Sequence, residues 1–389
     1  MDAFVLNDTP YSRQQLLDGC PQAQVSAYER RVLQFCQQWL SGQETFTLQT
    51  SGSTGQPKTI LLTRTQMVTS AHWTGHALGL QPGDRALVCL SVAYIAGMMM
   101  LVRGFELGLH LTVIDPVSRP LAAFTPARRF DFTAMVPLQL HETLHGNAYE
   151  GAILNDMQAV LIGGAPVSLA LEEHSQRVQA PLYHTYGMTE TVSHIALRRM
   201  NGPQRSERFM PFDEVRLGVD ARGCLTITSA LTRGDLLYTN DLVEFHADGS
   251  FRWLGRIDNV INSGGVKVHI EQVERAIEAW LMHYQGGVYA ERRFFVGPLA
   301  HPRLGYAVVA VIEGELDGEE AAGARAFTMA LRISLQQALT PYEIPRQVYF
   351  VPQLFETPTG KIDRRANLQR LAVQHSDAVP RGEGYASTS

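Results

Sequence analysis

Between residues 85 and 164, short apolar runs alternate with longer stretches of helical character. The runs are "RALVCLSV", "LHLTVID", "FDFTAMVP" and "MQAVLIGG". Strands that alternate with helices are joined by crossover connections, and such connections place neighbouring strands parallel to one another. The sequence therefore predicts an α/β fold built on a parallel sheet. The fourth run ends in "GGAP", a tight turn at which a ligand can approach the backbone.

The uncharged segment from Ala86 to Val102 raises the alternative of a membrane span. A span needs about 20 consecutive apolar residues, whereas this segment contains Ser91 and Tyr94 and ends at Arg103. We therefore expect a buried strand that leads into a buried helix, and no membrane span.

The pattern changes at about residue 213. Short alternating segments broken by Asp-Gly turns predict a β-rich part with hairpins. After "GRIDNVINSGG" a helix, strands and a second helix indicate a small α+β domain. We expect a large N-terminal α/β domain that includes the β-rich segment over 1–257, a small mobile α+β domain over 258–372, and a disordered tail over 373–389. Upstream of the parallel part, we expect an amphipathic helix over 21–40 and a helix over 64–80 capped by Thr63.

Composition and charge exclude several classes of protein. The chain has 389 residues, 45% of them apolar, and a net charge of −5, which argues against a nucleic-acid-binding surface. Its 4 cysteines are far apart and form neither a disulfide framework nor a metal knuckle. The N-terminus lacks the features of a signal peptide. We expect a cytoplasmic protein, with a homodimer as an open alternative for its assembly.

The loop "TSGSTGQPKTI", residues 50–60, matches the P-loop of nucleotide hydrolases only in part. Counted from Gly52, the Lys58 and Thr59 of the P-loop pattern are in place, but Pro57 occupies the position of the second glycine. Hydroxyl groups, a lysine and glycines that turn backbone N–H groups inward still suit phosphates. We predict a phosphate-binding loop of another class, with a surface turn as the alternative.

Two later stretches carry residue types that suit other parts of a nucleotide. In "YHTYGMTET", Tyr186 offers a flat face to a base, and Glu190 is a hard oxygen ligand for Mg²⁺. In "TND", Asp241 can accept hydrogen bonds from two ribose hydroxyls. Core packing is the alternative for Tyr186, and an ordinary hairpin charge is the alternative for Asp241.

The junction of the two patterns and the end of the second domain carry further candidates. "GRIDN" contains Arg256 and Asp258, and "PTGK" places Lys361 in a turn. A lysine in a turn is usually a solvated surface residue, so Lys361 alone carries little weight.

Taken together and in this order, the motifs resemble those of the adenylate-forming superfamily, which includes acyl-CoA synthetases, adenylation domains of peptide synthetases and luciferases. The resemblance covers roughly residues 47–370. Within the superfamily, "QTSGSTGQPKTI", "YIAGMMMLVRGFELGL", "YGMTETVSHIALRRMNG" and "LGRIDNVINSGGVKVHIEQVE" are most similar to short 2-succinylbenzoate–CoA ligases. This resemblance implies a ligase that forms an acyl-AMP from a carboxylic acid and ATP, releases pyrophosphate, and transfers the acyl group to CoA.

The resemblance also implies roles for individual residues. Lys361 would bridge the attacking carboxylate and the α-phosphate, Thr54 and Lys58 would assist catalysis, Glu190 would hold Mg²⁺, and Asp258 would be the hinge between the domains. The residues that would bind the nucleotide come from the loop, the "GGAP" turn, the "TYGMT" stretch and the second domain. They are Thr50, Ser51, Gly52, Ser53, Thr54, Gly55, Lys58, Gly164, Ala165, Pro166, Thr185, Tyr186, Gly187, Met188, Thr189, Asp241, Arg256 and Lys361.

The acid-binding residues implied in the same way are Tyr94, Arg103, Gly163, Gly187 and His194. Arg103 interrupts an apolar helix pattern, and arginine recognises carboxylates through a bidentate fork. It would therefore suit an acid with a second carboxylate, such as 2-succinylbenzoate. Two alternatives are that Arg103 reaches solvent at a helix end and that it pairs with Glu106, three residues on.

Two departures from the family pattern stand out. Only 49 residues precede the phosphate loop, whereas the family usually has more than about a hundred, so part of an N-terminal scaffold is expected to be missing. A histidine common in the family is replaced by Tyr94.

Three other functions remain open from the sequence: loading of a carrier protein, activation of another aryl or acyl acid, and non-catalytic nucleotide binding. The presence of Lys58, Glu190 and Lys361 argues against the last of these.

Overall fold

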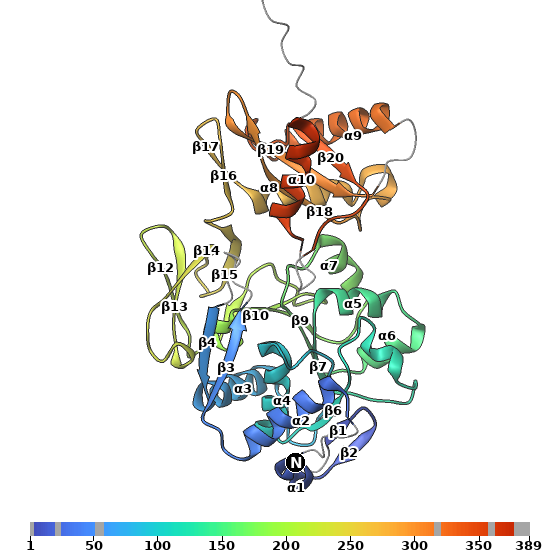
Figure 1. Ribbon diagram of the computed structural model, residues 1–389, viewed down its shortest axis with the longest axis vertical. Coiled ribbons are helices and arrows are strands. Elements are labelled where there is room, and N and C mark those ends of the chain that lie inside the picture. Colours follow the sequence, from blue (N-terminus) through green and yellow to red (C-terminus); the bar gives the residue numbers. More distant parts are fainter. Residues whose placement is uncertain (1–3, 20–24, 51–57, 315–319, 357–361, 377–389) are drawn as a thin grey trace, which may run out of the picture. The chain divides into compact units, whose positions relative to one another are not determined.

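The computed structural model describes residues 4–19, 25–50, 58–314, 320–356 and 362–376 (Figure 1). The chain divides into two compact units. The first comprises Met1–Thr239 with Val243–Trp253, and the second comprises Asn240–Leu242 with Leu254–Ser389. The domain boundary expected at residue 257/258 stays a prediction. The two units differ from it because Asn240–Leu242 and residues 254–257 group with the later residues.

The first unit is built on one large sheet with the strand order β11-β10-β9-β8-β7-β5-β6-β1-β2 over the described residues. From β9 to β1 all neighbours are parallel, while β10, β11 and β2 add antiparallel edges. The predicted α/β class with a parallel sheet is therefore confirmed. The strands are β1 (Phe4–Leu6), β2 (Thr9–Tyr11), β5 (Arg85–Val88), β6 (His110–Val113), β7 (Phe132–Met135), β8 (Ala159–Ile162), β9 (Leu182–Gly187), β10 (His194–Arg199) and β11 (Met210–Pro211).

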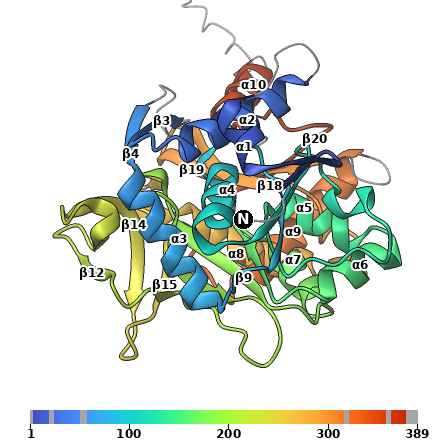
Figure 2. The same cartoon turned by 90° about the horizontal axis from the view of Figure 1, so that it is seen from below.

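Helices cover both faces of this sheet, and alternate strand residues point to opposite faces. Val88 packs into the core shared with α2, α3 and α4, whereas the preceding residue, Leu87, packs into the core shared with α5, α6 and α7. Helices α3 and α4 lie side by side (Figure 2). The helices are α1 (Arg13–Asp18), α2 (Ala27–Leu40), α3 (Arg64–Leu78), α4 (Ile95–Leu107), α5 (Pro137–Leu144), α6 (Ala148–Asn155) and α7 (Leu169–Ser175), with 3₁₀ turns η1 (Pro120–Ala123), η2 (Thr189–Thr191) and η3 (Ala230–Thr232).

Side-chain caps set the helix starts. Thr63 accepts a hydrogen bond from the backbone N–H of Gln66 and so caps α3 as predicted. The helix expected from residue 21 instead begins at Ala27, because Ser26 and Glu29 form a reciprocal capping box.

The uncharged segment that ends at Val102 forms the buried strand β5 and most of the buried helix α4, as predicted. Among the described residues, no helix combines the length and apolar character needed to cross a bilayer.

The predicted phosphate loop joins two strands of an antiparallel hairpin. Strands β3 (Thr45–Thr50) and β4 (Lys58–Thr63) pair so that Thr50 lies opposite Lys58. The hairpin therefore brings the two ends of the loop together, while residues 51–57 lie outside the described residues.

The β-rich segment forms a sheet with the order β12-β13-β14-β15, and the division between the two units passes through its last two strands. The strands are β12 (Arg216–Val219), β13 (Cys224–Thr228), β14 (Leu237–Phe245) and β15 (Phe251–Arg256).

The second unit is an α+β domain with its own core. Its sheet has the order β17-β16-β19-β18, and β20 pairs with β19 in parallel. The elements are β16 (Val260–Ser263), β17 (Val266–His269), α8 (Ile270–Leu281), η4 (Tyr284–Gly287), β18 (Phe294–His301), β19 (Gly305–Glu313), α9 (Glu320–Leu335), β20 (Gln347–Val351) and α10 (Arg364–Ser376). Helix α10, anchored by the buried Leu371, extends to Ser376, into the stretch from 373 that was predicted to be disordered.

Candidate functional site

Several predicted site residues of the first unit lie at the carboxyl ends of parallel strands. The strand order reverses around β5, which lies between β6 and β7, and open α/β sheets bind ligands at such a switch point. Tyr94 follows β5, Gly163 follows β8, and Gly187 ends β9. The topology thus brings these separated segments to one edge of the sheet. Tyr94 itself is 53% exposed and begins helix α4.

The turn after β8 requires glycine for a steric reason. A Cβ atom on Gly163 would lie 2.2 Å from Oγ1 of Thr185, and Gly164 has a φ of +83°. The Thr185 hydroxyl lies this close because it donates to the carbonyl of Ile162, at 3.3 Å. Thr185 therefore supports the turn from β9, and Gly163 lets the two backbones approach each other. Ala165 and Pro166 complete the turn before Ser168 caps α7.

Tyr186 is half-buried near the end of β9. Its ring packs against Phe251, with centroids 5.2 Å apart, and against Phe209, at 5.7 Å. Core packing, the alternative considered from the sequence, therefore accounts for part of the ring's surroundings. The residue keeps partial exposure at the edge of the sheet, and stacking of this ring on a base stays a prediction.

The segment after Tyr186 makes a tight, strained return to β10. Met188 precedes the 3₁₀ turn Thr189–Thr191, and Val192 follows with φ 65° and ψ −52°. The N–H of Ser193 donates a 2.6 Å hydrogen bond to the carbonyl of Thr191. Val192 is therefore the central residue of a γ-turn, of the rare type with positive φ. A β-branched residue in this conformation costs about 1–3 kcal/mol. Such strain is found mainly at functional sites.

Arg103 is buried in α4 and has few partners. It is 2% exposed, and its Nη2 donates to the hydroxyl of Ser193 at 2.8 Å. Among the described residues, its Nη1 contacts only the sulfur of Met100, at 3.7 Å, and its buried Nε has no partner. Burial lowers the pKa of Arg103 to about 9. Within the described ranges, no carboxylate forms an ion pair with this guanidinium.

Both alternatives for Arg103 are wrong. It does not reach solvent, and Glu106 interacts elsewhere: its carboxylate accepts a 2.9 Å hydrogen bond from the indole N–H of Trp39 and lies 3.6 Å from Nη2 of Arg64. The guanidinium of Arg64 also stacks over the Trp39 ring. Tertiary partners from α2 and α3 therefore outcompete the local i, i+3 pair.

A directional chain of hydrogen bonds links Arg103 to His194. Thr74 donates to the carbonyl of Ser70 at 2.9 Å, so its hydroxyl oxygen accepts from Nε2 of His194, 3.2 Å away. Nδ1 of His194 is then an acceptor for the hydroxyl of Ser193, also at 3.2 Å. Burial and the charge of Arg103 hold the pKa of His194 well below its usual value. The imidazole is therefore neutral and fixes Ser193 against the guanidinium.

In the second unit, the predicted ribose ligands and hinge contact one another. Arg256 lies 3.9 Å from the buried Asp241 and forms a bidentate pair with Asp258, at 2.8 and 2.6 Å. Asn240 also donates to Asp258, at 3.2 Å. Hydrogen bonds and charge from Arg256 lower the pKa of Asp258, and Asp258 raises that of Arg256. Binding of ribose by Arg256 would compete with this pair, so the ribose and hinge roles stay predictions.

Part of the predicted site lies outside the described residues. This part comprises Ser51, Gly52, Ser53, Thr54, Gly55 and Lys361. For Thr50 and Lys58 the structure describes the paired strand backbone alone.

The profile of AMP-binding enzymes matches residues 8–223, more than half of the chain. The chain belongs to the AMP-binding enzyme family. A probable 2-succinylbenzoate–CoA ligase from Mycobacterium tuberculosis is 31% identical over 346 residues, which cover 83% of both proteins. Relatives of this kind are AMP-forming acid–thiol ligases.

Solved structures of AMP-binding enzymes share the fold. An acyl-CoA synthetase (AMP-forming)/AMP-acid ligase II-like protein from Dyadobacter fermentans is 44% identical, with a TM-score of 0.58, over 90% of this chain and 96% of its own. The 2-succinylbenzoate–CoA synthetase of Bacillus subtilis, solved in complex with ATP and a magnesium ion, is 20% identical, with a TM-score of 0.65, over 83% of this chain and 69% of its own.

For an AMP-binding enzyme, Glu190 fits the role of magnesium ligand. Its carboxylate is half-buried in the 3₁₀ turn after β9 and makes no hydrogen bond or ion pair within the part of the chain that the structure describes. A hard oxygen ligand that has no protein partner suits Mg²⁺ on a polyphosphate. When bound, the ion would neutralise phosphate charge.

Sequence reasoning missed Thr74 and Ser193 at this site. Both are ordinary hydroxyl residues in the sequence, and no local pattern distinguishes them. Their contacts with His194 depend on the packing of α3 against the β9–β10 return. A serine beside a predicted site histidine was the one available signal.

Gly163→Ala should destabilise the first unit through the clash with Thr185. Overpacking of this kind costs about 1–3 kcal/mol. We expect the loss in the free energy of unfolding, measured by denaturant titration. The double variant Gly163→Ala/Thr185→Ala should recover much of this loss, because it removes the clashing hydroxyl. If the second substitution adds to the loss, the steric explanation is wrong.

The buried His194 should make the protein sensitive to acid. The unfolded imidazole takes up a proton below a pH of about 6.5, whereas folded His194, with its lowered pKa, does not, so stability should fall as the pH decreases from 6.5. His194→Gln should reduce this slope in chemical denaturation at a series of pH values. Some slope should persist, because the half-buried His184 also has a lowered pKa.

The control for this titration is His76→Gln, which removes an exposed histidine of α3. Equal slopes for His194→Gln and the wild type would contradict the assignment.

Proposed function

We propose that this AMP-binding enzyme activates a carboxylic acid with ATP and transfers the acyl group to CoA, and that the acid is 2-succinylbenzoate. In the first half-reaction a carboxylate oxygen attacks the α-phosphorus, the bond to the bridging oxygen of the β-phosphate breaks, and pyrophosphate leaves. In the second, the CoA sulfur attacks the acyl carbon, AMP leaves, and the thiol proton is released.

This chemistry requires positioning and charge neutralisation more than proton transfer. A carboxylate is already a nucleophile at neutral pH, so the first step needs no general base. Lys361 would bridge the carboxylate and the α-phosphate, and Lys58 with Thr54 would hold the leaving phosphates. The hairpin pairing of Thr50 with Lys58 supports this proposal, since it closes a loop at the position where the phosphates would bind.

The buried guanidinium of Arg103 is the observation that carries the choice of acid. A charge buried without an opposite partner is costly, and the cost falls when an anion binds. A monocarboxylic acid uses its carboxylate at the α-phosphate and leaves none for Arg103. A diacid such as 2-succinylbenzoate brings a second one, which favours it over a fatty acid.

The hydrogen-bonded neighbours of Arg103 support the same proposal. Ser193 accepts from the guanidinium on one side, and the neutral His194 holds that hydroxyl in place. The planar guanidinium therefore has a fixed orientation and still has unused N–H donors for a carboxylate. The names of the curated relatives agree with this acid.

A panel assay tests the proposal directly. Pyrophosphate release is measured with ATP, Mg²⁺ and each of several acids, and acyl-CoA formation is then measured after addition of CoA. We expect 2-succinylbenzoate to give the highest kcat/KM in both. Pyrophosphate release without acyl-CoA formation would indicate a carrier-protein acceptor. If no acid of the panel gave pyrophosphate release, the proposal that this protein activates an acid would be contradicted.

Arg103→Leu should remove the preference for the diacid. Losing one charged partner in a dry site costs on the order of 2–5 kcal/mol. We expect kcat/KM for 2-succinylbenzoate to fall by more than about tenfold, while KM for ATP changes little. With 4-oxo-4-phenylbutanoate, which lacks the second carboxylate, wild type and variant should be similarly slow.

Arg64→Leu is the matched control, because it removes a guanidinium that contacts Trp39 and Glu106 instead. An Arg103→Leu enzyme that keeps the wild-type ratio between the two acids would show that Arg103 has no role in acid selection.

Lys361→Ala should separate the two half-reactions. The substitution removes the charge that would bridge the carboxylate and the α-phosphate, so adenylate formation should be abolished. Transfer from chemically prepared acyl-AMP to CoA should be much less affected, because no phosphoryl bond is formed in that step. Stopped-flow kinetics give the rate of each half-reaction separately. An equal loss of rate in both would contradict the role assigned to Lys361.

A further inference from the structure

Three histidines that no predicted role uses lie together on helices α5 and α7 of the first unit. His141 is in α5, and His145 follows its last residue, so the two are one helical turn apart. Their ligand nitrogens lie within 4.8 Å of each other, and their ring centroids are 4.3 Å apart. The ring of His174, in α7, lies against that of His145, with centroids 5.2 Å apart. Imidazole is a preferred ligand of zinc, copper and nickel ions.

The first two histidines belong to the sequence "HETLH", residues 141–145. Histidines four residues apart on a helix share one face, and H-E-x-x-H on a helix is a zinc-binding pattern. Helix α5 ends at Leu144, but the backbone N–H of His145 still donates to the carbonyl of His141, at 3.1 Å, as a further helical turn would. The two rings therefore keep the spacing of a helical pair.

One hydrogen bond determines which nitrogen of His145 carries the lone pair. Nδ1 of His145 lies 2.9 Å from the carbonyl oxygen of His141. A carbonyl oxygen can only accept, so Nδ1 is protonated and the lone pair of the neutral ring is on Nε2. Nδ1 of His141 lies 3.5 Å from the carboxylate of Glu142. Metal-binding histidines typically have their second nitrogen against a backbone carbonyl or a carboxylate, which fixes the ring and makes the ligand nitrogen more basic.

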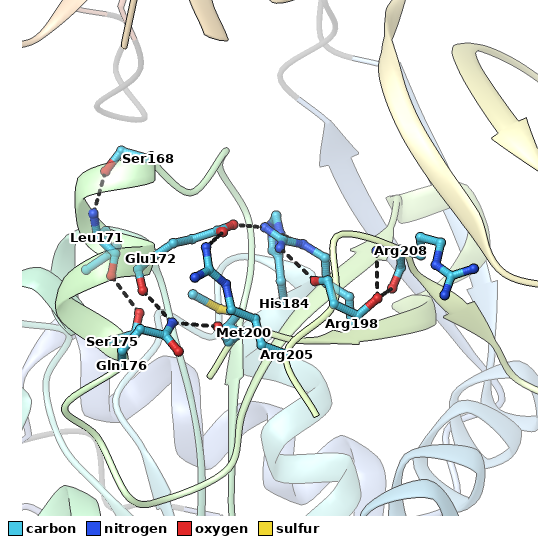
Figure 3. Close-up of polar contacts among 11 residues, drawn as sticks. Ser168, Leu171, Glu172, Ser175, Gln176, His184, Arg198, Met200, Arg205 and Arg208 are labelled. Carbon is cyan, nitrogen blue, oxygen red and sulfur yellow. Dashed lines mark hydrogen bonds and ion pairs between the residues drawn. The ribbon is translucent and has the colours of Figure 1, made fainter. Parts of the chain in front are cut away.

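Polar contacts with the sheet hold the helix that carries His174 (Figure 3). The buried Glu172 of α7 pairs with Arg198 of β10, and Nε of Arg198 donates to Nδ1 of His184 of β9, at 3.1 Å. Helix α7 also packs against α5. The place of His174 beside His145 is therefore set by contacts in which neither ring takes part.

The spacing of the three rings suits a tetrahedral ion. Two imidazoles on one zinc ion, with Zn–N bonds of about 2.0–2.1 Å, have ring centroids about 5 Å apart. The observed distances are 4.3 and 5.2 Å. His145 is exposed, and together with His174 it lines a cavity of about 240 Å³ whose lining residues all belong to the first unit. An ion can therefore enter from solvent and keep a water molecule as its fourth ligand.

We propose that His141, His145 and His174 bind a divalent transition-metal ion such as Zn²⁺, with Nε2 as the ligand atom of His145. The bound ion would cross-link α5 and α7. Glu142 lies against His141, so it orients this ligand and does not act as the general base of a hydrolase. Magnesium prefers oxygen ligands, so this site is distinct from that of Glu190. Binding at the three histidines does not depend on the proposed function.

The test is a calorimetric titration of the protein with Zn²⁺ in excess Mg²⁺, without ATP, acid or CoA, at a pH at which imidazole is neutral. His141→Gln, His145→Gln and His174→Gln should each weaken Zn²⁺ binding by more than about tenfold, because even the loss of an outer partner of a ligand costs about 10–100-fold. His76→Gln, which removes an exposed histidine of α3, is the matched control and should bind like the wild type.

Replacing Zn²⁺ by Co²⁺ adds a readout of geometry. Co²⁺ on the wild type should show the strong visible absorption of tetrahedral coordination, and His145→Gln should lose it. Denaturant titration without metal checks the fold of each variant, and the exposed His145 keeps the test available if His174→Gln does not fold.

Three outcomes would overturn this site. The first is a wild type that does not bind Zn²⁺, and the second is an affinity in the three variants equal to that of His76→Gln. The third is a loss of affinity in His141→Gln and His145→Gln with none in His174→Gln, which would leave an ordinary helical histidine pair.

Discussion

A parallel sheet delivers the last residue of every strand to one edge, and the candidate site of this chain depends on that constraint. Strands β5, β8 and β9 each end in a segment that the sequence had marked for other reasons. The approach of the backbones is close enough that Gly163 has no room for a Cβ beside Thr185. Side chains from segments almost a hundred residues apart in sequence therefore meet because of topology, before any specific side-chain contact forms.

One series of hydrogen bonds in this region has a defined direction at every step. From Arg103 through Ser193 and His194 to Thr74, each hydrogen bond has a defined donor and acceptor, and the last donor reaches a helix carbonyl. Nε of Arg103 stands outside this series, without a partner among the described residues. Both histidines near the site are neutral because burial and a neighbouring guanidinium oppose their protonation. Neutral imidazoles can accept on one nitrogen and donate on the other. His194 therefore links the hydroxyl of Ser193 to that of Thr74 in one tautomer.

Local pattern predicted the elements that local chemistry controls. The alternating apolar runs became β5 to β8, and Thr63 caps α3, because hydrophobic period and capping act over a few residues. The start of α2 was misplaced, since the Ser26 capping box overrides the apolar period before it. Helix spacing made Glu106 a reasonable partner for Arg103. In the structure its carboxylate instead contacts Trp39 and Arg64, which are distant in the sequence. Ser193 and Thr74 needed the three-dimensional arrangement, including the bulge between His194 and Ala196, to be recognised.

The second compact unit is not one continuous piece of chain, and this affects any attempt at domain exchange. Asn240–Leu242 belongs with it although residues on both sides belong to the first unit. The backbone N–H of Ile257 donates to the carbonyl of Asn240, and Asp241 faces Arg256. A chimera joined at 257/258 would take Asn240 from one parent and Asp258 from the other, although these residues contact each other directly. Recombination between relatives should therefore favour parents that match at residues 240–242 as well as downstream of the junction.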